Sequence, residues 1–342
     1  MSSTEYPGLW YAARHPPADP QASFAGKTVL VTGANIGLGF EAATKYAALG
    51  AASVILGVRT ISKGEEAKAS IIQRTGCSPD VIQVRQLDMS LFSSVQDFAA
   101  KLVREVGRLD VALLNAGVAS PTYKTSPEGW EMSLQVNVLS SALLAILLLP
   151  KLRETSRRSP GNSQNTPHLE FTGSAAHRSV DAAKLRAGPQ ENLLETISSQ
   201  AFFNATMQYN VAKLLDMYVI QALADAVRAP NGDPEVIVNI TCPGFCRSNL
   251  GRDFPWLVQK TIHLVQYFLA RTSEEGSRSL VSATAQGKES HGKFWIHDKL
   301  ATPGDLVTSE EGQKIQVQAW GEILDVLRKQ SPEVDAILED RV

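Results

Sequence analysis

The sequence has few cysteines and no paired histidines, and each shortage excludes a kind of site. Cys77, Cys242 and Cys246 are too few and too scattered for a disulfide framework. The last two lie close together, but their C-x3-C spacing, with Pro and Gly between them, is not a zinc pattern. None of the six histidines forms a His-x3-His pair. We therefore expect no metal site, and reduced thiols in a cytoplasmic protein.

The chain also lacks an excess of charge of either sign and a long apolar run. Its formal net charge is −2 over 342 residues, so no basic surface indicates a nucleic-acid partner. The longest apolar run, 142–150, is far shorter than the ~20 residues that a membrane-spanning helix needs. The first residues show no basic-then-apolar signal pattern. With 44% hydrophobic residues, we expect a large core and no transmembrane segment.

A regular alternation of short apolar runs and helical stretches fills most of the chain. The first run, 27–32, is β-branched and suits a strand buried on both faces. Further strands are expected at 53–58, 81–87, 109–114, 168–172, 235–240 and 292–296. Helices are expected at 39–49, 63–74, 91–106, 127–153 and 203–228. This alternation predicts βαβ units, and therefore an α/β fold with a doubly wound parallel sheet.

Two segments interrupt this alternation, at 177–202 and at 249–271. Both follow the ends of expected strands, where α/β domains bind their ligands, so we expect them to form the wall of a substrate pocket. Within the second segment, 256–269 has apolar residues at helical spacing and is equally typical of a helix packed on the core.

A glycine-rich turn follows the first expected strand. Gly33, Gly37 and Gly39 fall as G-x3-G-x-G, with Asn35 and Ile36 between them, and a helix begins there. Glycine lets the backbone turn sharply and lets a pyrophosphate approach without a Cβ in the way. The helix N-terminus offers free N–H groups and a partial positive charge. A glycine turn in this context predicts a dinucleotide site.

The end of the second expected strand indicates which dinucleotide binds. An acid about 20 residues past the glycines accepts the ribose hydroxyls of NAD, whereas a basic residue holds the 2′-phosphate of NADP. Here Arg59 follows the strand, Lys63 comes one turn later, and no acid appears before Glu65. The sequence therefore predicts NADP(H), the alternative being an arginine that is merely exposed at a strand end.

Tyr209 and Lys213 stand four residues apart in an expected helix, and so share one of its faces. An ammonium near a phenol favours the ionised form and lowers the phenol pKa from its usual value of about 10. A Tyr/Lys pair alone is usually plain helix surface, so its meaning depends on what surrounds it.

Taken together, these motifs resemble the short-chain dehydrogenases/reductases. The matching stretches are TGANIGLG at 32–39, Leu87-Asp88, Leu114-Asn115-Ala116-Gly117, Asn137, Ser174, Tyr209-x3-Lys213 and Pro243-Gly244. The resemblance covers about residues 25–300. Within the family, the chain is most similar to the retinol-dehydrogenase-like branch and to reductases of fungal natural-product pathways.

The resemblance implies a division of the chain and a set of cofactor contacts. It implies one Rossmann-fold dehydrogenase/reductase domain at 26–305. The Pro- and Ala-rich residues 1–25 are expected to form an N-terminal arm, and the helical pattern near the end predicts a C-terminal helical extension at 306–342. In the arm, Tyr6, Leu9, Trp10 and Tyr11 are candidates to pack onto the body. The implied cofactor-binding residues are Gly33, Asn35, Ile36, Gly37, Gly39, Arg59, Lys63, Asp88, Asn115, Tyr209, Lys213, Phe245 and Ser248.

Particular roles follow from the same resemblance. Asp88 is expected at the adenine, Asn115 at the adenine ribose and the central sheet, and Lys213 at the nicotinamide ribose. Phe245 and Ser248 are expected beside the carboxamide. The implied catalytic residues are Ser174, Tyr209, Lys213 and Asn137: Tyr209 moves the proton, Ser174 holds the substrate oxygen, Lys213 tunes Tyr209, and Asn137 holds a water.

The chain departs from the family pattern at a few positions. Leu114 replaces the first Asn of Asn-Asn-Ala-Gly, and Cys246 and Ser248 replace the Val and Thr expected after Pro-Gly. Ser174 and Tyr209 are 35 positions apart, farther than in many members, which suggests a larger lip on the pocket.

We therefore expect an NADP(H)-dependent oxidoreductase that reduces a ketone or aldehyde, or oxidises the alcohol, of a bulky apolar metabolite in secondary-metabolite biosynthesis. Two alternatives stay open: the same fold catalysing dehydration or isomerisation, and a dinucleotide-binding protein without turnover. The long apolar helix from Asn137 suits the dimer-forming helix of the family, and allows a homodimer.

Overall fold

The computed structural model describes residues 9–158, 166–185, 192–247, 266 and 268–340. Within these residues the strands form one eight-stranded sheet in the order β3-β2-β1-β4-β5-β6-β7-β8. All neighbouring pairs are parallel except β7 and β8. The strands are β1 (Thr28–Thr32), β2 (Ser53–Val58), β3 (Ile82–Gln86), β4 (Val111–Leu114), β5 (His168–Thr172), β6 (Ile237–Cys242), β7 (Phe294–Ile296) and β8 (Lys299–Ala301).

The sheet is doubly wound, as the alternation of strands and helices predicts. The chain runs outward from β1 through β2 to β3, and then returns to place β4 on the other side of β1. This reversal lies between β1 and β4, and such folds bind dinucleotides beyond the carboxyl ends of the strands at this point. The central strands are apolar and almost wholly buried, because helices cover both faces of the sheet.

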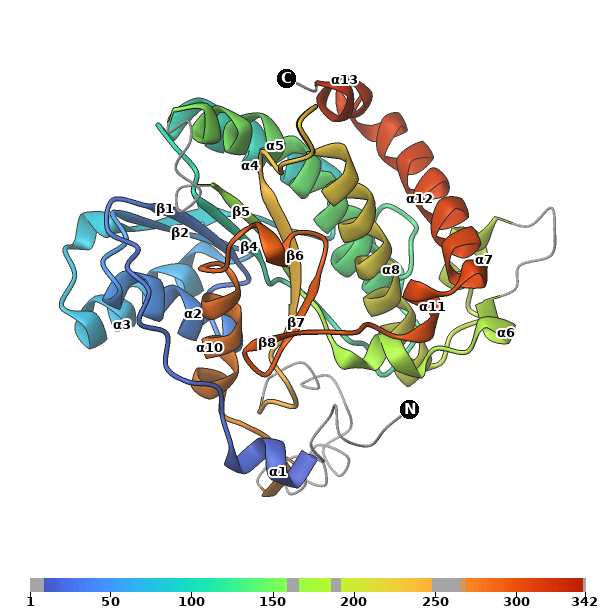
Figure 1. Cartoon of the computed structure of the whole chain (residues 1–342), viewed down its shortest axis with the longest axis horizontal. Coiled ribbons are helices and arrows are strands. Elements are labelled where there is room, and N and C mark those ends of the chain that lie inside the picture. Colours follow the sequence, from blue (N-terminus) through green and yellow to red (C-terminus); the bar gives the residue numbers. More distant parts are fainter. Residues whose placement is uncertain (1–8, 159–165, 186–191, 248–265, 267, 341–342) are drawn as a thin grey trace.

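Helices form a layer on each face of the sheet (Figure 1). On one face, α2, α3 and α10 share a core with β1 and β2, and on the other face α4, α5 and α8 share the larger core. The α-helices are α1 (Leu9–Arg14), α2 (Gly37–Ala48), α3 (Ile61–Thr75), α4 (Phe92–Glu105), α5 (Ser140–Arg157), α6 (Ala182–Leu185), α7 (Leu193–Ser198), α8 (Ala205–Ala226), α10 (Ser273–Ala283), α11 (Asp305–Thr308), α12 (Glu310–Gln330) and α13 (Val334–Glu339). Short 3-10 turns lie at η1 (Pro79–Val81), η4 (Ala175–Ser179) and η6 (Lys288–Ser290), and a π-helical turn at η2 (Leu134–Leu139).

The two C-terminal helices cover the larger core. In Figure 1, α12 runs beside α8, and α13 lies near one end of α5. Ala319, Ile323 and Leu327 of α12 are fully buried in the same core as α5 and α8. The continuous helix 134–157 is long and apolar enough to cross a membrane by length and composition, but 94% of that stretch is buried inside the protein. It is therefore read as the core helix of the domain.

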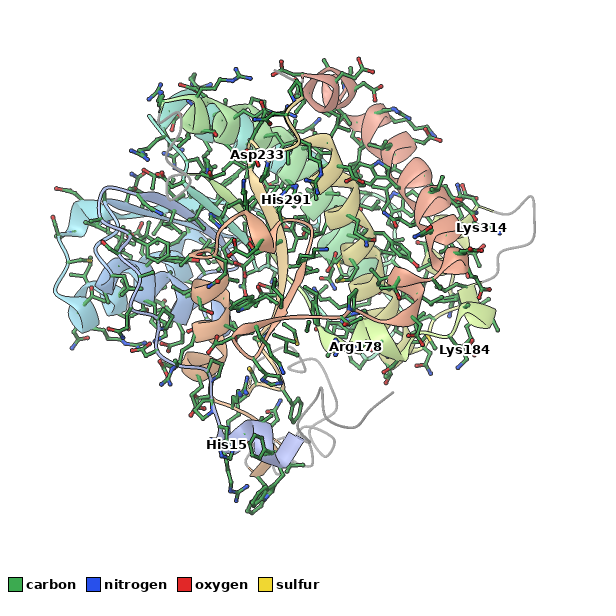
Figure 2. The ribbon with its side chains drawn as sticks, in the orientation of Figure 1. His15, Arg178, Lys184, Asp233, His291 and Lys314 are labelled. Carbon is green, nitrogen blue, oxygen red and sulfur yellow. The ribbon has the colours of Figure 1, made fainter. Side chains whose placement is uncertain are left out.

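Hydrogen bonds from Arg271 hold the described part of the N-terminal arm against the domain. Arg271 Nε donates to Ala12 O (2.9 Å) and its Nη2 donates to His15 O (3.1 Å), near the lower end of the view in Figure 2. Trp10 and Tyr11 are 58% and 50% exposed, so the expectation that they pack onto the body is wrong. Tyr6 and the Leu9 side chain lie outside the described part of the chain.

Several elements differ from the sequence-based expectation. The long helix begins at 134 instead of 127, because a turn with Gly129 at φ 89° and a bridge between Thr125 and Glu131 precede it. The hairpin partner β8 was not expected, since its turn uses His297 and Asp298, both at positive φ, instead of a glycine. The described parts of the segment 177–202 hold the end of η4, α6 and α7. The proposed helix 256–269 lies almost entirely outside the described residues.

Candidate active site

The glycine turn after β1 has the shape that a pyrophosphate requires. Gly33 and Gly37 adopt φ of 66° and 61°, which side chains rarely tolerate. A Cβ on Gly39 would lie 2.4 Å from Asn115 Nδ2 and 2.6 Å from Gly33 O, so only glycine fits. The N-cap of α2, Ile36, makes no side-chain capping bond, which leaves the helix N-terminus to a ligand. The residues present therefore fit a bound dinucleotide.

Asn115 and two threonines join the carboxyl ends of three strands beside that turn. Thr32 Oγ1 accepts the N–H groups of Asn115 and Ala116, both at 2.9 Å, and Asn115 Nδ2 donates to Thr32 O at 3.0 Å. Thr172 Oγ1 donates to Asn115 Oδ1 at 3.4 Å. Asn115 thus connects β1, β4 and β5, and its contact with a ribose stays a prediction.

The residues proposed for the adenosine end of the cofactor lie at the ends of β2 and β3. Arg59 and Lys63 are exposed, and in the described part of the chain neither makes a hydrogen bond or ion pair. Asp88 Oδ1 accepts from Ser90 N (2.9 Å) and Ser90 Oγ (2.7 Å), and so shapes the turn after β3. Two cations without a partner in the described part of the chain suit a phosphate at this edge.

The structure brings Ser174, Tyr209 and Lys213 together. Ser174 lies just beyond β5, at the start of η4, where its Oγ accepts from Ala176 N at 3.2 Å and lies close enough to the Tyr209 phenol to act on the phenol pKa. Asn204 caps α8 by accepting from the N–H groups of Thr206 and Met207, which sets the helix just before Tyr209. Lys213 Nζ lies 5.8 Å from the centroid of the Tyr209 ring.

Burial decides the direction in which the Tyr209 pKa moves. Burial raises the pKa of Tyr209 above its ordinary value, while Lys213 and the nearby Ser174 hydroxyl act to lower it. The expectation that the ammonium brings this pKa down is therefore wrong for the net effect. The phenol is protonated at neutral pH and is suited to give a proton.

Lys213 is held by two acceptors inside the protein. Its Nζ donates to Thr172 O at 2.8 Å and to Asp216 Oδ2 at 2.9 Å. Asp216 was not predicted from the sequence, although its spacing from Lys213 places the two on one helix face.

Asn137 lies in the π-helical turn η2, a deviation that is frequent at functional sites. Its Oδ1 accepts from Val118 N at 2.8 Å, and its Nδ2 donates to Val118 O at 2.9 Å. The side chain therefore holds the loop that follows β4, and a water relay through Asn137 remains a prediction.

The loop after β6 adjoins the turn that carries Ser174. Cys242 Sγ accepts from Ala175 N (3.3 Å) and Gly244 N (3.4 Å), so it ties the two segments together. Gly244 has φ 83°, and a Cβ there would lie 2.9 Å from Arg271 Nη1. Phe245 is exposed beside this loop, whereas Ser248 lies outside the described residues. Neither Cys242 nor Arg271 was foreseen, because their contacts depend on the folded chain.

His177 and Arg178 anchor the insertion to the strand end. His177 Nε2 accepts from Gly304 N (2.9 Å), so its Nδ1 carries the proton and donates to Ser174 O (2.6 Å). Burial lowers the pKa of His177 to about 4. Arg178, labelled in Figure 2, donates to Thr302 O on the segment between β8 and α11.

Helix α7 of the insertion lies between α12 and the loop after β4. The N–H groups of Leu193 and Leu194 donate to the Glu322 carboxylate at 3.0 and 2.8 Å. Tyr123 OH donates to Ser198 O at 3.0 Å, and its ring meets Phe203 edge-on at 5.8 Å. This aromatic pair is consistent with the predicted wall of a substrate pocket at this position. The pocket wall itself stays a prediction.

A doubly wound sheet with a glycine turn at its reversal point, and a Ser–Tyr–Lys cluster beside it, defines an oxidoreductase that uses a nicotinamide dinucleotide. A family model described as short chain dehydrogenase matches residues 27–162. The chain is 50% identical over 333 residues to the short-chain dehydrogenase/reductase ffsI of Aspergillus flavipes, covering 97% of this chain and 95% of that protein. It is 48% identical over 328 residues to phmF of Phaeosphaeria nodorum, covering 96% and 94%. The chain belongs to the short-chain dehydrogenase/reductase family.

Solved structures agree with this assignment. The crystal structure of the short chain dehydrogenase from Shigella flexneri has a TM-score of 0.58 at 26% identity, covering 84% of this chain and 97% of that one. A crystal structure from Escherichia coli CFT073, complexed with NADPH, has a TM-score of 0.58 at 24% identity, covering 82% and 100%. The predicted family and the predicted fold are both confirmed.

Proposed function

We propose that the protein is an NADP(H)-dependent oxidoreductase that reduces a ketone or aldehyde, or oxidises the corresponding alcohol. The observation that carries this proposal is the meeting of Ser174, Tyr209 and Lys213 beside a glycine turn that fits a pyrophosphate. The NADPH in the Escherichia coli neighbour adds support for the phosphorylated dinucleotide.

Residues on both sides of the reversal point would hold the cofactor. Gly33, Asn35, Ile36, Gly37 and Gly39, with the N-terminus of α2, would hold the pyrophosphate. Arg59 and Lys63 would hold the 2′-phosphate, Asp88 and Asn115 the adenosine, and Phe245 and Ser248 the carboxamide end. When bound, the nicotinamide supplies the hydride for reduction, or accepts it in oxidation.

The side chains supply the proton and the position of the substrate. The Tyr209 phenol, kept protonated by its raised pKa, donates to the carbonyl oxygen as negative charge grows there. Ser174 Oγ hydrogen-bonds the same oxygen and holds it in line with the phenol. Lys213 stabilises the tyrosinate left behind, and Asn137 keeps the loop after β4 in place.

The substrate that we propose is a bulky apolar metabolite of a secondary pathway. The insertion 177–202 and the Tyr123–Phe203 pair support a large apolar pocket, and the two relatives described above come from fungi. We place the protein in the cytoplasm, since Cys77, Cys242 and Cys246 are all free. Because α4 and α13 cover α5, we propose that any homodimer forms through another surface.

The test is a set of reductions by the purified full-length protein. NADPH and NADH consumption is followed with a panel of polycyclic and aliphatic ketones and aldehydes, and the product mass is measured. NADPH-dependent gain of two hydrogens is the expected result. Loss of water would instead support dehydration, and dinucleotide binding with no consumption on any panel member would support a non-catalytic protein; either result overturns the proposal.

A further inference from the structure

A buried ion pair lies within the helix that carries the proton donor. Asp216 follows Lys213 by three residues on α8, and its Oδ2 is 2.9 Å from Lys213 Nζ. The two side chains are 2% and 8% exposed, so water does not screen the pair as it screens a pair on the surface. Such a carboxylate has a strong effect on the ammonium and on the phenol beside it.

The ammonium has three N–H donors, and the protein uses two of them. Thr172 O, at the end of β5, accepts one at 2.8 Å, and Asp216 accepts another. One donor is left for a ligand. The second oxygen of Asp216, Oδ1, is buried and has no partner among the described residues. The carboxylate is therefore directed at Lys213 instead of fastening α8 to another element.

Few other titratable groups change the pKa values in the cluster of Tyr209, Lys213 and Asp216. Cys242, at the end of β6, acts to raise the pKa of both Tyr209 and Lys213.

The other titratable groups packed against α8 are bound to partners outside this cluster. Glu131 accepts from Gln208 and Ser133. His177 and Arg178 of η4 bond the 302–304 segment, and Glu322 of α12 bonds α7. Arg153 and His291 bond the carbonyls of Ala226 and Ala224 near the end of α8. Asp305 of α11 is exposed to solvent.

The two charges act on Tyr209 in opposite senses. Burial has the largest effect on the pKa of Tyr209, Lys213 lowers it, and Asp216 raises it. Burial by itself would lower the pKa of Lys213, but Asp216 and Tyr209 outweigh burial and raise it, so the ammonium stays charged.

We propose that Asp216 is a positioning residue for the reaction. It holds the Lys213 ammonium against β5 and leaves one N–H of that ammonium free. Its negative charge offsets the tendency of the ammonium to favour the ionised form of Tyr209. The carboxylate thereby adds to the effect of burial, which keeps the Tyr209 phenol in its proton-donating form. This inference rests on the proposed function only in assigning Tyr209 as the proton donor.

The test is the variant Asp216→Asn in the full-length chain, which keeps the shape and an acceptor oxygen but removes the charge. Tyrosinate absorbance is titrated against pH, with Tyr209→Phe in each background to subtract the other tyrosines. We expect the Tyr209 midpoint to move to lower pH, so that the tyrosinate fraction at a fixed pH below the midpoint rises about threefold or more. Asp225→Asn, an 80% exposed carboxylate on the same helix, is the matched control and leaves the midpoint unchanged.

Two further variants separate the charge from a general loosening of the site. Asp216→Glu restores the charge in a bulkier side chain, so the midpoint returns toward the wild-type value. If Asp216→Glu lowers the midpoint as much as Asp216→Asn does, loosening is the cause and the proposal fails. Asp216→Ser is titrated in the same way if Asp216→Asn does not fold.

The titration needs neither cofactor nor substrate, so it is independent of turnover. An unmoved midpoint in Asp216→Asn rejects the role of Asp216, while Tyr209-dependent NADPH consumption would leave the proposed function standing. Conversely, if the protein binds no NADPH, the proposed function is rejected. The titration then still reports whether the charge of Asp216 changes the Tyr209 midpoint.

Discussion

Arg59 is the residue on which the choice of dinucleotide depends. It stands exposed at the end of β2, with Lys63 one helical turn away, and in the described part of the chain it has no protein partner. A charge-assisted bond to a phosphate contributes roughly 1.5–3 kcal/mol, so Arg59→Ala is expected to raise the KM for NADPH about tenfold or more. The KM for NADH should change little. Steady-state kinetics with both dinucleotides checks this.

Lys101→Ala is the matched control for Arg59→Ala. Lys101 is also exposed, but it lies on α4, on the other face of the sheet. It is expected to leave both KM values unchanged. Equal effects of Arg59→Ala on NADPH and NADH would contradict the assignment of the 2′-phosphate to this edge.

At the same scale, the sequence and its family resemblance indicated a candidate proton donor and its neighbours, but not the groups that hold them. Tyr209 and Lys213 stand out by their helical spacing, and the resemblance implies their roles and that of Ser174. Asp216, Cys242 and the Thr172 carbonyl were not predicted, because which acceptors reach an ammonium or an N–H group depends on burial and strand register. The raised pKa of Tyr209 was missed for the same reason.

At the scale of elements, α12 completes the core over α8. Ile323 is fully buried there, so Ile323→Ala leaves a cavity and is expected to lower the free energy of unfolding by about 2–4 kcal/mol. Val317 lies on the same helix but is 74% exposed. Val317→Ala should therefore change the free energy of unfolding by only about 0.5 kcal/mol or less. Chemical denaturation of both variants measures the difference, and similar losses in the two would contradict the packing of α12 described above.

Elements formed by local pattern were predicted closely, and those formed by tertiary contact were not. The strands 53–58 and 168–172 occur as expected, because β-branched apolar runs suit strands buried on both faces. The π-helical turn η2 and the antiparallel strand β8 leave no such signal in the sequence. The contacts of the N-terminal arm also depend on a distant residue, Arg271.

For the whole molecule, buried histidines make stability depend on pH. Burial lowers the pKa of His168 and of His177 from 6.5 to about 4. Between these values the unfolded chain takes up protons that the folded protein does not. The free energy of unfolding is therefore expected to fall as pH falls from 6.5 toward 4, by up to about 1.4 kcal/mol per pH unit for each ring, and to keep this contribution in full above 6.5.

His177→Gln tests this dependence, because it removes one of the rings whose pKa is lowered. Burial also lowers the pKa of His297 to about 4 and lowers that of His291, and both rings stay in the variant. Denaturation at several pH values should give a shallower loss of stability on acidification than in the wild-type protein. His15→Gln, at an exposed position, should keep the wild-type slope. Burial raises the pKa of Glu170, which makes the free energy of unfolding fall as pH rises above 4.5, so variants and wild type are compared at equal pH. An unchanged slope in His177→Gln would refute the assignment.

The central claim for the molecule as a whole is that Tyr209 gives the proton during an NADPH-dependent reduction. Tyr209→Phe removes one hydroxyl from a ring that lies beside Lys213 and Ser174. The most direct measurement compares wild type and Tyr209→Phe for NADPH affinity, by titration, and for turnover of the best carbonyl substrate. We expect NADPH affinity within about twofold of wild type and kcat reduced by about 10²–10⁴-fold. Full turnover in Tyr209→Phe would contradict the account.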